Sequence, residues 1–189
     1  MTANKSIQQV LAKYPRNELI RTPTPLVHLK HLSERLDVDL FIKRDDLTDL
    51  ALGGDKPRKL EYETAKAIAQ GTTVLVTCGS AQSNHARLTT AAAKKLGLKC
   101  ALVLSSDGSK AFQSNLLTVY LMGAEVRFVE TKDHWDLESH ALAFCEELRL
   151  RGERPYYIPV SGTTATGCLG YVRAGLELVD QFEAQDVRL

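Results

Sequence analysis

The alternation of short apolar runs with longer amphipathic stretches constrains this chain most. Runs rich in β-branched residues, such as TVLVTC at 73–78 and KCALVLSS at 99–106, alternate with stretches whose apolar residues recur at helical spacing. This alternation is typical of a parallel sheet with helices on both faces, so the sequence predicts an α/β fold. The expected strands are 38–44, 73–78, 99–106, 124–130 and 155–160, and the expected helices are 56–70, 84–97, 111–123, 135–151 and 166–183.

Charge and hydropathy exclude several kinds of partner. The 189 residues include 24 basic and 23 acidic side chains, for a net charge of +1, without a basic stripe interleaved with aromatics, so we expect no nucleic-acid partner. The apolar runs are far shorter than the roughly 20 residues of a membrane span, and the polar start MTANKSIQQ lacks a signal peptide's apolar stretch. We therefore expect a cytoplasmic protein without a membrane partner. The four cysteines lack zinc-site spacing, and we expect no metal.

Three loops carry sequences that suit ligand binding. DDLTDLALGGDK at 45–56 and PVSGTTATGCLG at 159–170 each precede a predicted helix, and CGSAQSNH at 78–85 leads from a strand end into a helix. In open parallel sheets, ligands bind beyond the carboxyl ends of the strands, where helix N-termini offer unpaired N–H groups. We therefore expect the functional site at that end of the sheet.

Lys56 is the strongest candidate for a reactive side chain. It follows Gly53-Gly54-Asp55 at the opening of a predicted helix. The glycines allow a ligand to approach the backbone, and the helix dipole disfavours the ammonium form, as a Schiff-base lysine requires. Lys59 lies on the same helical face, where its charge could favour the neutral amine of Lys56 or hold an anionic group of a cofactor. From composition alone, a solvated basic helix start explains the same residues.

Two histidine patterns point less directly to chemistry. Ser83 and His85 invite a nucleophile-and-base interpretation, but residues two apart at a helix start do not face each other. Any role of Ser83 must then come through a ligand. The spacing of His28 and His31 could suit a metal, yet no carboxylate or thiol cluster joins them, so we expect both on a surface helix.

Four segments of the chain resemble one enzyme family. The dinucleotide and nucleotide-triphosphate fingerprints GxGxxG and GxxxxGK[ST] are absent. IKRDDLTDLALGGDKPRKLEY at 42–62 and CGSAQSNHARLTTAAAKKLGL at 78–98 resemble the D-cysteine desulfhydrase and 1-aminocyclopropane-1-carboxylate deaminase family. The resemblance continues through RTPTPLVHL at 21–29 and YYIPVSGTTATGCLGYVRAGLEL at 156–178. These are enzymes of the tryptophan synthase β-like fold (fold type II), so the resemblance implies the N-terminal half of that fold and pyridoxal 5′-phosphate as cofactor.

The resemblance also implies roles for individual residues. Lys56 matches the family lysine that bonds covalently to the cofactor, and Lys59 matches a lysine near the cofactor phosphate. Within the family's QSN element, here Gln82-Ser83-Asn84, the serine lies close to the substrate and the asparagine contacts the 3-hydroxyl of the cofactor ring. The implied catalytic residues are Lys56 and Ser83, the cofactor-binding residues are Lys56, Lys59 and Asn84, and the substrate-binding residues are Ser83, Asn84 and His85.

The implied activity is a pyridoxal-phosphate-dependent lyase reaction on a small amino acid. β-Elimination from D-cysteine would give pyruvate, ammonia and sulfide. His85 is more similar to the desulfhydrase branch, because the deaminase branch usually has glutamine at this position. A 1-aminocyclopropane-1-carboxylate deaminase, an amino-acid racemase and a catalytically incompetent truncated fragment remain alternatives.

The chain departs from the family pattern in sequence and in length. Asp55 stands where the family usually has asparagine, and a carboxylate beside Lys56 favours the ammonium over the free amine. CGSA at 78–81 replaces a stretch that is commonly glycine-rich and followed by isoleucine. Family members are far longer, so the chain resembles about half an enzyme, which would be a homodimer at full length. The expected domains are the start of a large cofactor domain at 1–58, a small α/β domain at 59–169 and a shortened return to the large domain at 170–189.

Overall fold

A four-stranded parallel sheet, in the order β5-β4-β3-β6, forms the centre of the structure. This computed structural model describes residues 2–106, 113–131 and 133–187. The strands of the sheet are β3 (Val74–Ser80), β4 (Lys99–Ser105), β5 (Glu125–Val129) and β6 (Pro155–Tyr157). The helices are α1 (Thr2–Leu11), α2 (Lys30–Leu36), α3 (Lys56–Ala69), α4 (Asn84–Lys95), α5 (Ser114–Leu121), α6 (His134–Leu150) and α7 (Ala165–Ala184).

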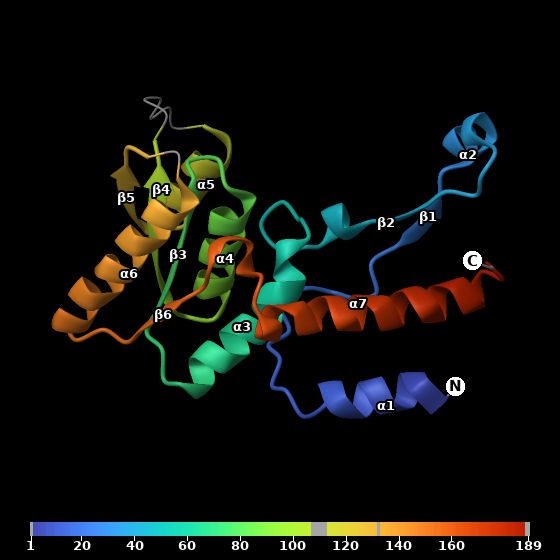
Figure 1. Cartoon of the computed structure of the whole chain (residues 1–189), viewed down its shortest axis with the longest axis horizontal. Coiled ribbons are helices and arrows are strands. Elements are labelled where there is room, and N and C mark those ends of the chain that lie inside the picture. Colours follow the sequence, from blue (N-terminus) through green and yellow to red (C-terminus); the bar gives the residue numbers. More distant parts are fainter. Residues whose placement is uncertain (1, 107–112, 132, 188–189) are drawn as a thin grey trace.

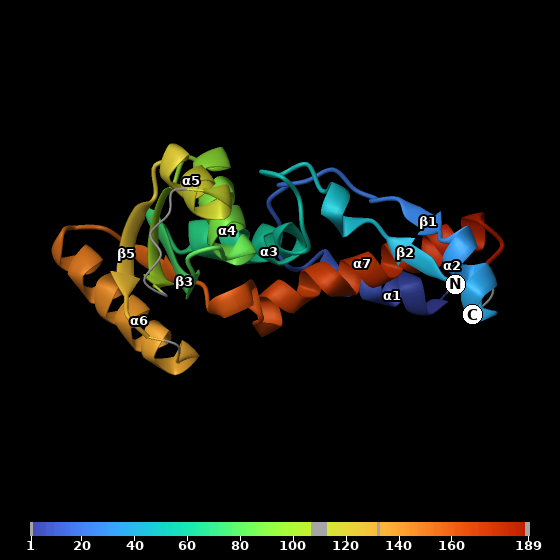
Figure 2. The same cartoon turned by 90° about the horizontal axis from the view of Figure 1, so that it is seen from above.

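Helices cover both faces of this sheet, as the two views show (Figure 1 and Figure 2). Because successive strand residues point to opposite faces, neighbouring residues of β3 enter different cores. Leu75 packs with residues of α3, α4 and α5, whereas Val76 packs with residues of α6. Burial on both faces explains why β3 and β4 are almost entirely apolar. The predicted α/β class with a parallel sheet is therefore confirmed.

One predicted strand lies outside the parallel sheet. The segment expected at 38–44 forms β2 (Phe41–Lys43), which pairs antiparallel with β1 (Leu26–His28) in a separate two-stranded ribbon. The sequence predicted neither β1, which has only three residues, nor α1, and the surface helix expected at His28 and His31 begins only at Lys30, as α2. Figure 1 shows α1 and this ribbon on opposite sides of the long helix α7, away from the sheet, with α2 at the far end of the ribbon.

The remaining predicted elements agree with the structure to within a few residues at their ends. For the helix expected at 111–123, the described part is α5, because residues 111 and 112 lie outside the described residues. The four-stranded sheet falls inside the range 59–169, but the division into domains stays a prediction. Within the described residues, no helix is both long and apolar enough to cross a bilayer.

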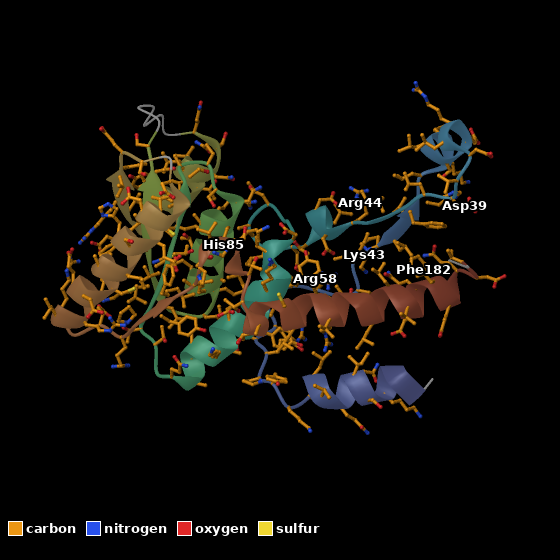
Figure 3. The ribbon with its side chains drawn as sticks, in the orientation of Figure 1. Asp39, Lys43, Arg44, Arg58, His85 and Phe182 are labelled. Carbon is orange, nitrogen blue, oxygen red and sulfur yellow. The ribbon has the colours of Figure 1, made fainter. Side chains whose placement is uncertain are left out.

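A buried ion cluster fixes the first turn of α3. Arg58 is 1% exposed, and its guanidinium donates to the Asp45 carboxylate at 2.7 and 2.9 Å and to the Glu177 carboxylate at 2.9 and 3.0 Å. Asp45 belongs to the 3-10 turn η1 (Asp45–Leu47), and Glu177 belongs to α7. Lys43 from β2 adds a second ion pair to Glu177 at 3.1 Å. The cluster thus joins the start of α3 to the segment 43–45 and to α7, which is more than 100 residues away in the sequence, and Figure 3 shows Arg58 and Lys43 in this region.

The cluster stays ionised in spite of its burial. Burial by itself raises the pKa of the Asp45 and Glu177 carboxyls, but the hydrogen bonds and charge of Arg58, aided by Lys43 and, at Asp45, by Thr24, outweigh it and lower both pKa values. For Arg58, burial lowers the pKa, and the two carboxylates more than reverse that shift. Removing the guanidinium would therefore leave two partly buried negative charges without their main partner.

A glycine allows α7 to cross close to the same turn. A Cβ at Gly170 would lie 2.0 Å from the carbonyl oxygen of Arg58, a distance that no side chain tolerates. Because Gly170 has no Cβ, the backbones of α3 and α7 come into direct contact. The contact and the ion cluster together hold the start of α3 in one position.

Replacing Arg58 with methionine should lower the free energy of unfolding by about 3 to 5 kcal/mol, because breaking a buried pair leaves its partners uncompensated. Replacing Arg149 with methionine should change it by less than about 1 kcal/mol, because its partner Glu146 and Arg149 itself are both largely exposed. Urea unfolding followed by circular dichroism measures both effects. Equal losses in the two variants would contradict the role given to the cluster.

Candidate active site

Lys56 is the first residue of α3 and lies directly after a tight glycine loop. Its Nζ forms an ion pair with the carboxylate of Asp55, and 18% of its side chain is exposed. Gly53 and Gly54 have φ angles of 73° and 136°, a region that favours glycine. A Cβ at Gly53 would lie 2.1 Å from the carbonyl oxygen of Asp46. The Gly-Gly pair is therefore required by the path of the chain into α3.

Two side chains hold this loop in place. Thr48 donates from Oγ1 to the carbonyl oxygen of Gly54 at 2.8 Å and accepts from the Gly54 N–H at 2.9 Å. Arg87, on α4, donates from NH2 to the carbonyl oxygen of Gly53 at 3.1 Å. The loop before Lys56 is thus attached to the helix that follows the QSN element.

The turn at 82–84 joins the carboxyl end of β3 to α4. Ser83 is the N-cap of α4, and its Oγ accepts from the N–H of Ala86 at 3.2 Å. Since this bond uses only a lone pair, the hydroxyl hydrogen of Ser83 remains available for a ligand. Asn84 accepts at Oδ1 from Arg87 NH2 at 3.3 Å and from Asn115 Nδ2 at 2.9 Å. Each side chain thus keeps donor hydrogens that it does not use in these bonds.

His85 lies in the interior, at the first turn of α4, with 3% of its surface exposed (Figure 3). Its Nε2 is 3.0 Å from the hydroxyl of Thr77, which donates its one hydrogen to the carbonyl oxygen of Ile158 at 2.7 Å. The hydroxyl oxygen must therefore accept from His85, so Nε2 carries the ring proton. Nδ1 is buried and has no hydrogen-bond partner among the described residues. Within the described residues, the side chains of His85 and Ser83 make no hydrogen bond to each other, as their spacing predicted.

His85 is neutral at pH 7. Burial lowers its pKa to about 4, and the positive charges of Lys56 and Lys59 act in the same direction, against the Pro159 carbonyl and the Asp55 carboxylate. The two lysines therefore lie close enough to the ring to affect its charge. His28 lies on β1, where its ring stacks on that of Phe41 with 4.8 Å between the centroids, so its expected position on a surface helix is wrong. His31 lies on α2 and is exposed, as expected.

Lys59 connects α3 with the third predicted ligand loop. Its Nζ donates to Oγ1 of Thr163 at 2.8 Å and to the carbonyl oxygen of Ser161 at 3.3 Å. Between these partners lies Gly162, where a Cβ would be 3.5 Å from Cε1 of His85 and 3.7 Å from Cβ of Lys59. The structure thus brings the predicted lysines, the QSN turn and the loop at 159–170 to one place.

The groups present at this place fit pyridoxal phosphate. The cofactor needs an amine to bond with its aldehyde, donors for its ring oxygen, and cations or N–H groups for its phosphate. Lys56 would supply the amine, Asn84 the donors and Lys59 the cation. The unpartnered Nδ1 of His85 is a buried polar atom that the surrounding chain leaves unsatisfied. Within the described chain, no cluster of three side chains suitable for a metal ion is present.

Sequence reasoning missed two residues at this place, Arg87 and Asn115. Arg87 lies three residues after Asn84, and this helical spacing could have revealed the contact. Asn115 comes from another helix, and no local pattern connects it to Asn84. A cavity of about 560 Å³ between α1 and α7 contains none of the predicted site residues.

Two solved structures are similar to this chain, one in fold alone and one in both fold and sequence. A threonine deaminase structure covers 100% of this chain with a TM-score of 0.67 at 24% identity, a likeness that shows the fold alone. A structure described as an ACC deaminase homologue matches with a TM-score of 0.89 at 45% identity, over 93% of this chain and 53% of its own.

The family model described as pyridoxal-phosphate dependent enzyme matches residues 18–188. A putative 1-aminocyclopropane-1-carboxylate deaminase of Pyrococcus horikoshii is 45% identical over 93% of this chain and 54% of its own length. D-cysteine desulfhydrase of Serratia proteamaculans is 40% identical over 96% of this chain and 56% of its own length. The chain belongs to the family of pyridoxal-phosphate-dependent enzymes, and it spans about half the length of these relatives.

The buried, neutral state of His85 predicts a pH dependence of stability. Between about pH 6.5 and 4, the unfolded chain takes up a proton at His85 that the folded chain does not, so stability should fall as the pH falls through this window. His85→Gln should remove this part of the slope, which is at most about 1.4 kcal/mol per pH unit. Urea unfolding at several pH values measures it, with His140→Gln as the exposed control. An unchanged slope in the His85 variant would show that the ring is not held neutral.

Proposed function

We propose that this chain forms the lysine-bearing part of the active site of a pyridoxal-phosphate-dependent lyase. Its substrate would be D-cysteine, and the products would be pyruvate, ammonia and sulfide. The observation that carries the proposal is the meeting of Lys56, the turn at 82–84 and Lys59 around the neutral ring of His85. Relatives named D-cysteine desulfhydrase, 40% to 43% identical to this chain, support the choice of substrate.

The residues of the chain would share the work as follows. When bound, pyridoxal phosphate supplies an electron sink for negative charge at the α-carbon of the substrate. Lys56 would bind the cofactor covalently and, once the substrate amine has taken its place, remove the α-proton. Lys59 would face the cofactor phosphate, at the loop where its ammonium already bonds Thr163.

Substrate orientation would fall to the turn at 82–84. The hydroxyl hydrogen of Ser83 and the N–H groups of the first turn of α4 would donate to the substrate carboxylate. Asn84 would contact the 3-oxygen of the cofactor ring. His85 would lie behind this turn as a neutral, buried ring close to the substrate.

A 1-aminocyclopropane-1-carboxylate deaminase is the second candidate. Relatives with that name reach 45% identity, slightly above the desulfhydrases. The same lysine would serve both reactions, and the family resemblance separates them at position 85, where this chain has histidine.

The family resemblance also supports proposals about the whole protein. We propose a small α/β domain at 59–169 between two parts of a larger cofactor domain, at 1–58 and 170–189. The protein would be a cytoplasmic homodimer that takes a small amino acid as its partner and does not bind membranes.

Lys56 should carry the covalent label when the protein is incubated with pyridoxal phosphate, reduced with borohydride and analysed by peptide mapping. Lys56→Ala should lose the label, whereas Lys66→Ala, a change on the exposed side of α3, should retain it. Asp55→Asn should be labelled faster than the native protein, because it removes the carboxylate that pairs with the ammonium of Lys56. A label on a different lysine would refute the assignment of Lys56.

Native-length protein with pyridoxal phosphate should release sulfide and pyruvate from D-cysteine, and Lys56→Ala should reduce the rate at least about a thousandfold, because it removes both the covalent attachment and the base. Parallel assays measure ammonia release from 1-aminocyclopropane-1-carboxylate. Turnover of the cyclopropane substrate without sulfide release from D-cysteine would decide for the second candidate. His85→Gln should shift the ratio of the two activities toward the cyclopropane substrate.

A further inference from the structure

Asn115 joins the start of α5 to the turn at 82–84. Its backbone N–H donates to Oε1 of Gln82 at 3.0 Å, and its Nδ2 donates to the carbonyl oxygen of Gln82 at 2.8 Å and to Oδ1 of Asn84 at 2.9 Å. Gln82 returns a bond from Nε2 to the carbonyl oxygen of Gln113 at 3.3 Å. A helix more than 30 residues away in sequence thus holds both ends of the QSN element.

The chemistry of these partners fixes which way each carboxamide points. A backbone carbonyl oxygen can only accept, so the atom of Asn115 that bonds Gln82 must be its nitrogen. A guanidinium can only donate, so the atom of Asn84 that faces Arg87 must be its oxygen. Both hydrogens of Asn115 Nδ2 are then in use, and Oδ1 of Asn84 has two donors.

Arg87 is a buried side chain that helps to hold the carboxamide of Asn84 in this orientation. It is 4% exposed, and its Nε and NH1 have no hydrogen-bond partner among the described residues. Its NH2 bonds both Asn84 and the carbonyl oxygen of Gly53, in the loop before Lys56. A buried guanidinium with so few acceptors would not give up the oxygen of Asn84 without a further loss.

We infer that Asn115 is a positioning residue that, together with Arg87, turns the carboxamide of Asn84 so that its NH2 group faces the ligand. Within the described residues, no hydrogen bond uses the two hydrogens of Asn84 Nδ2. The ligand must therefore present an acceptor to Asn84, because a donor would meet N–H groups. This inference rests on the proposed function for the identity of that acceptor, which is the 3-oxygen of the cofactor ring.

Hydrogen exchange in the protein without cofactor tests the orientation by itself. Side-chain amide NMR should show the Nδ2 hydrogens of Asn115 protected from solvent and those of Asn84 exchanging as an exposed carboxamide does. In Asn115→Asp, which has the same shape but no donors, the signals of Asn84 should shift. Protected hydrogens on Asn84, together with rapid exchange on Asn115, would overturn the inference whatever the protein binds.

Binding of two cofactor analogues tests the consequence. Pyridoxine 5′-phosphate has the ring 3-hydroxyl but no aldehyde, so it reports contacts other than the bond to Lys56. Its 3-deoxy analogue lacks the acceptor oxygen. Asn115→Asp should weaken binding of pyridoxine 5′-phosphate about fivefold or more, as expected for one misdirected hydrogen bond, and leave the 3-deoxy analogue within about twofold. Asn17→Asp, the same change at a carboxamide that bonds Thr64, should leave both affinities unchanged.

A double-mutant cycle separates positioning from a general loss of structure. If Asn115 acts through Asn84, Asn115→Asp should have almost no effect on binding of pyridoxine 5′-phosphate in an Asn84→Ala background. Equal losses for both analogues, or fully additive losses in the cycle, would overturn the positioning role. A native protein that binds neither analogue would refute the proposed function and the identity of the acceptor with it, while the exchange experiment would still decide the orientation of Asn84.

Discussion

The guanidinium of Arg58 is the interaction on which the arrangement of this chain depends. It lies in the first turn of α3, between Lys56 and Lys59, and it bonds carboxylates from η1 and from α7. Neither lysine is buried with it, because the helix directs them to another side of the same turn. The buried charge fixes the turn, and the two half-buried lysines of the same turn are thereby held in place.

Three glycines allow other segments of the chain to pack close to the first turn of α3. Gly170 lets α7 cross the backbone of Arg58, Gly53 lets the loop before Lys56 fold back on Asp46, and Gly162 lets the third loop fit between Lys59 and His85. At Gly170 and Gly53 two backbone segments come closer than a Cβ would allow, and at Gly162 the φ angle of 60° favours glycine. The turn at 82–84 follows the carboxyl end of β3, where ligands bind in parallel α/β sheets. His85 lies at its buried side and stays neutral because of its burial and the two lysines.

Most strands of the parallel sheet could be predicted from the sequence, whereas the separate ribbon of β1 and β2 could not. The runs at 73–78 and 99–106 are buried on both faces, so their composition alone shows them to be inner strands. β1 is too short for a periodic pattern, and β2 was therefore assigned to the wrong kind of pairing. Lys56 was predicted from its position after a glycine loop, and the roles of Ser83, Asn84 and His85 were implied by the family resemblance. Asn115, Glu177 and Asp45 act through tertiary contacts, which no local spacing encodes.

We propose that the buried cluster at Arg58 holds Lys56 in a position ready to receive pyridoxal phosphate. A crystal structure of the native-length protein with bound pyridoxal phosphate tests it most directly. The account predicts continuous density from Nζ of Lys56 to the cofactor, with Nδ2 of Asn84 at hydrogen-bonding distance from the ring 3-oxygen and Arg58 still bonded to Asp45 and Glu177. A cofactor attached elsewhere, or a first turn of α3 that has left these two carboxylates, would contradict it.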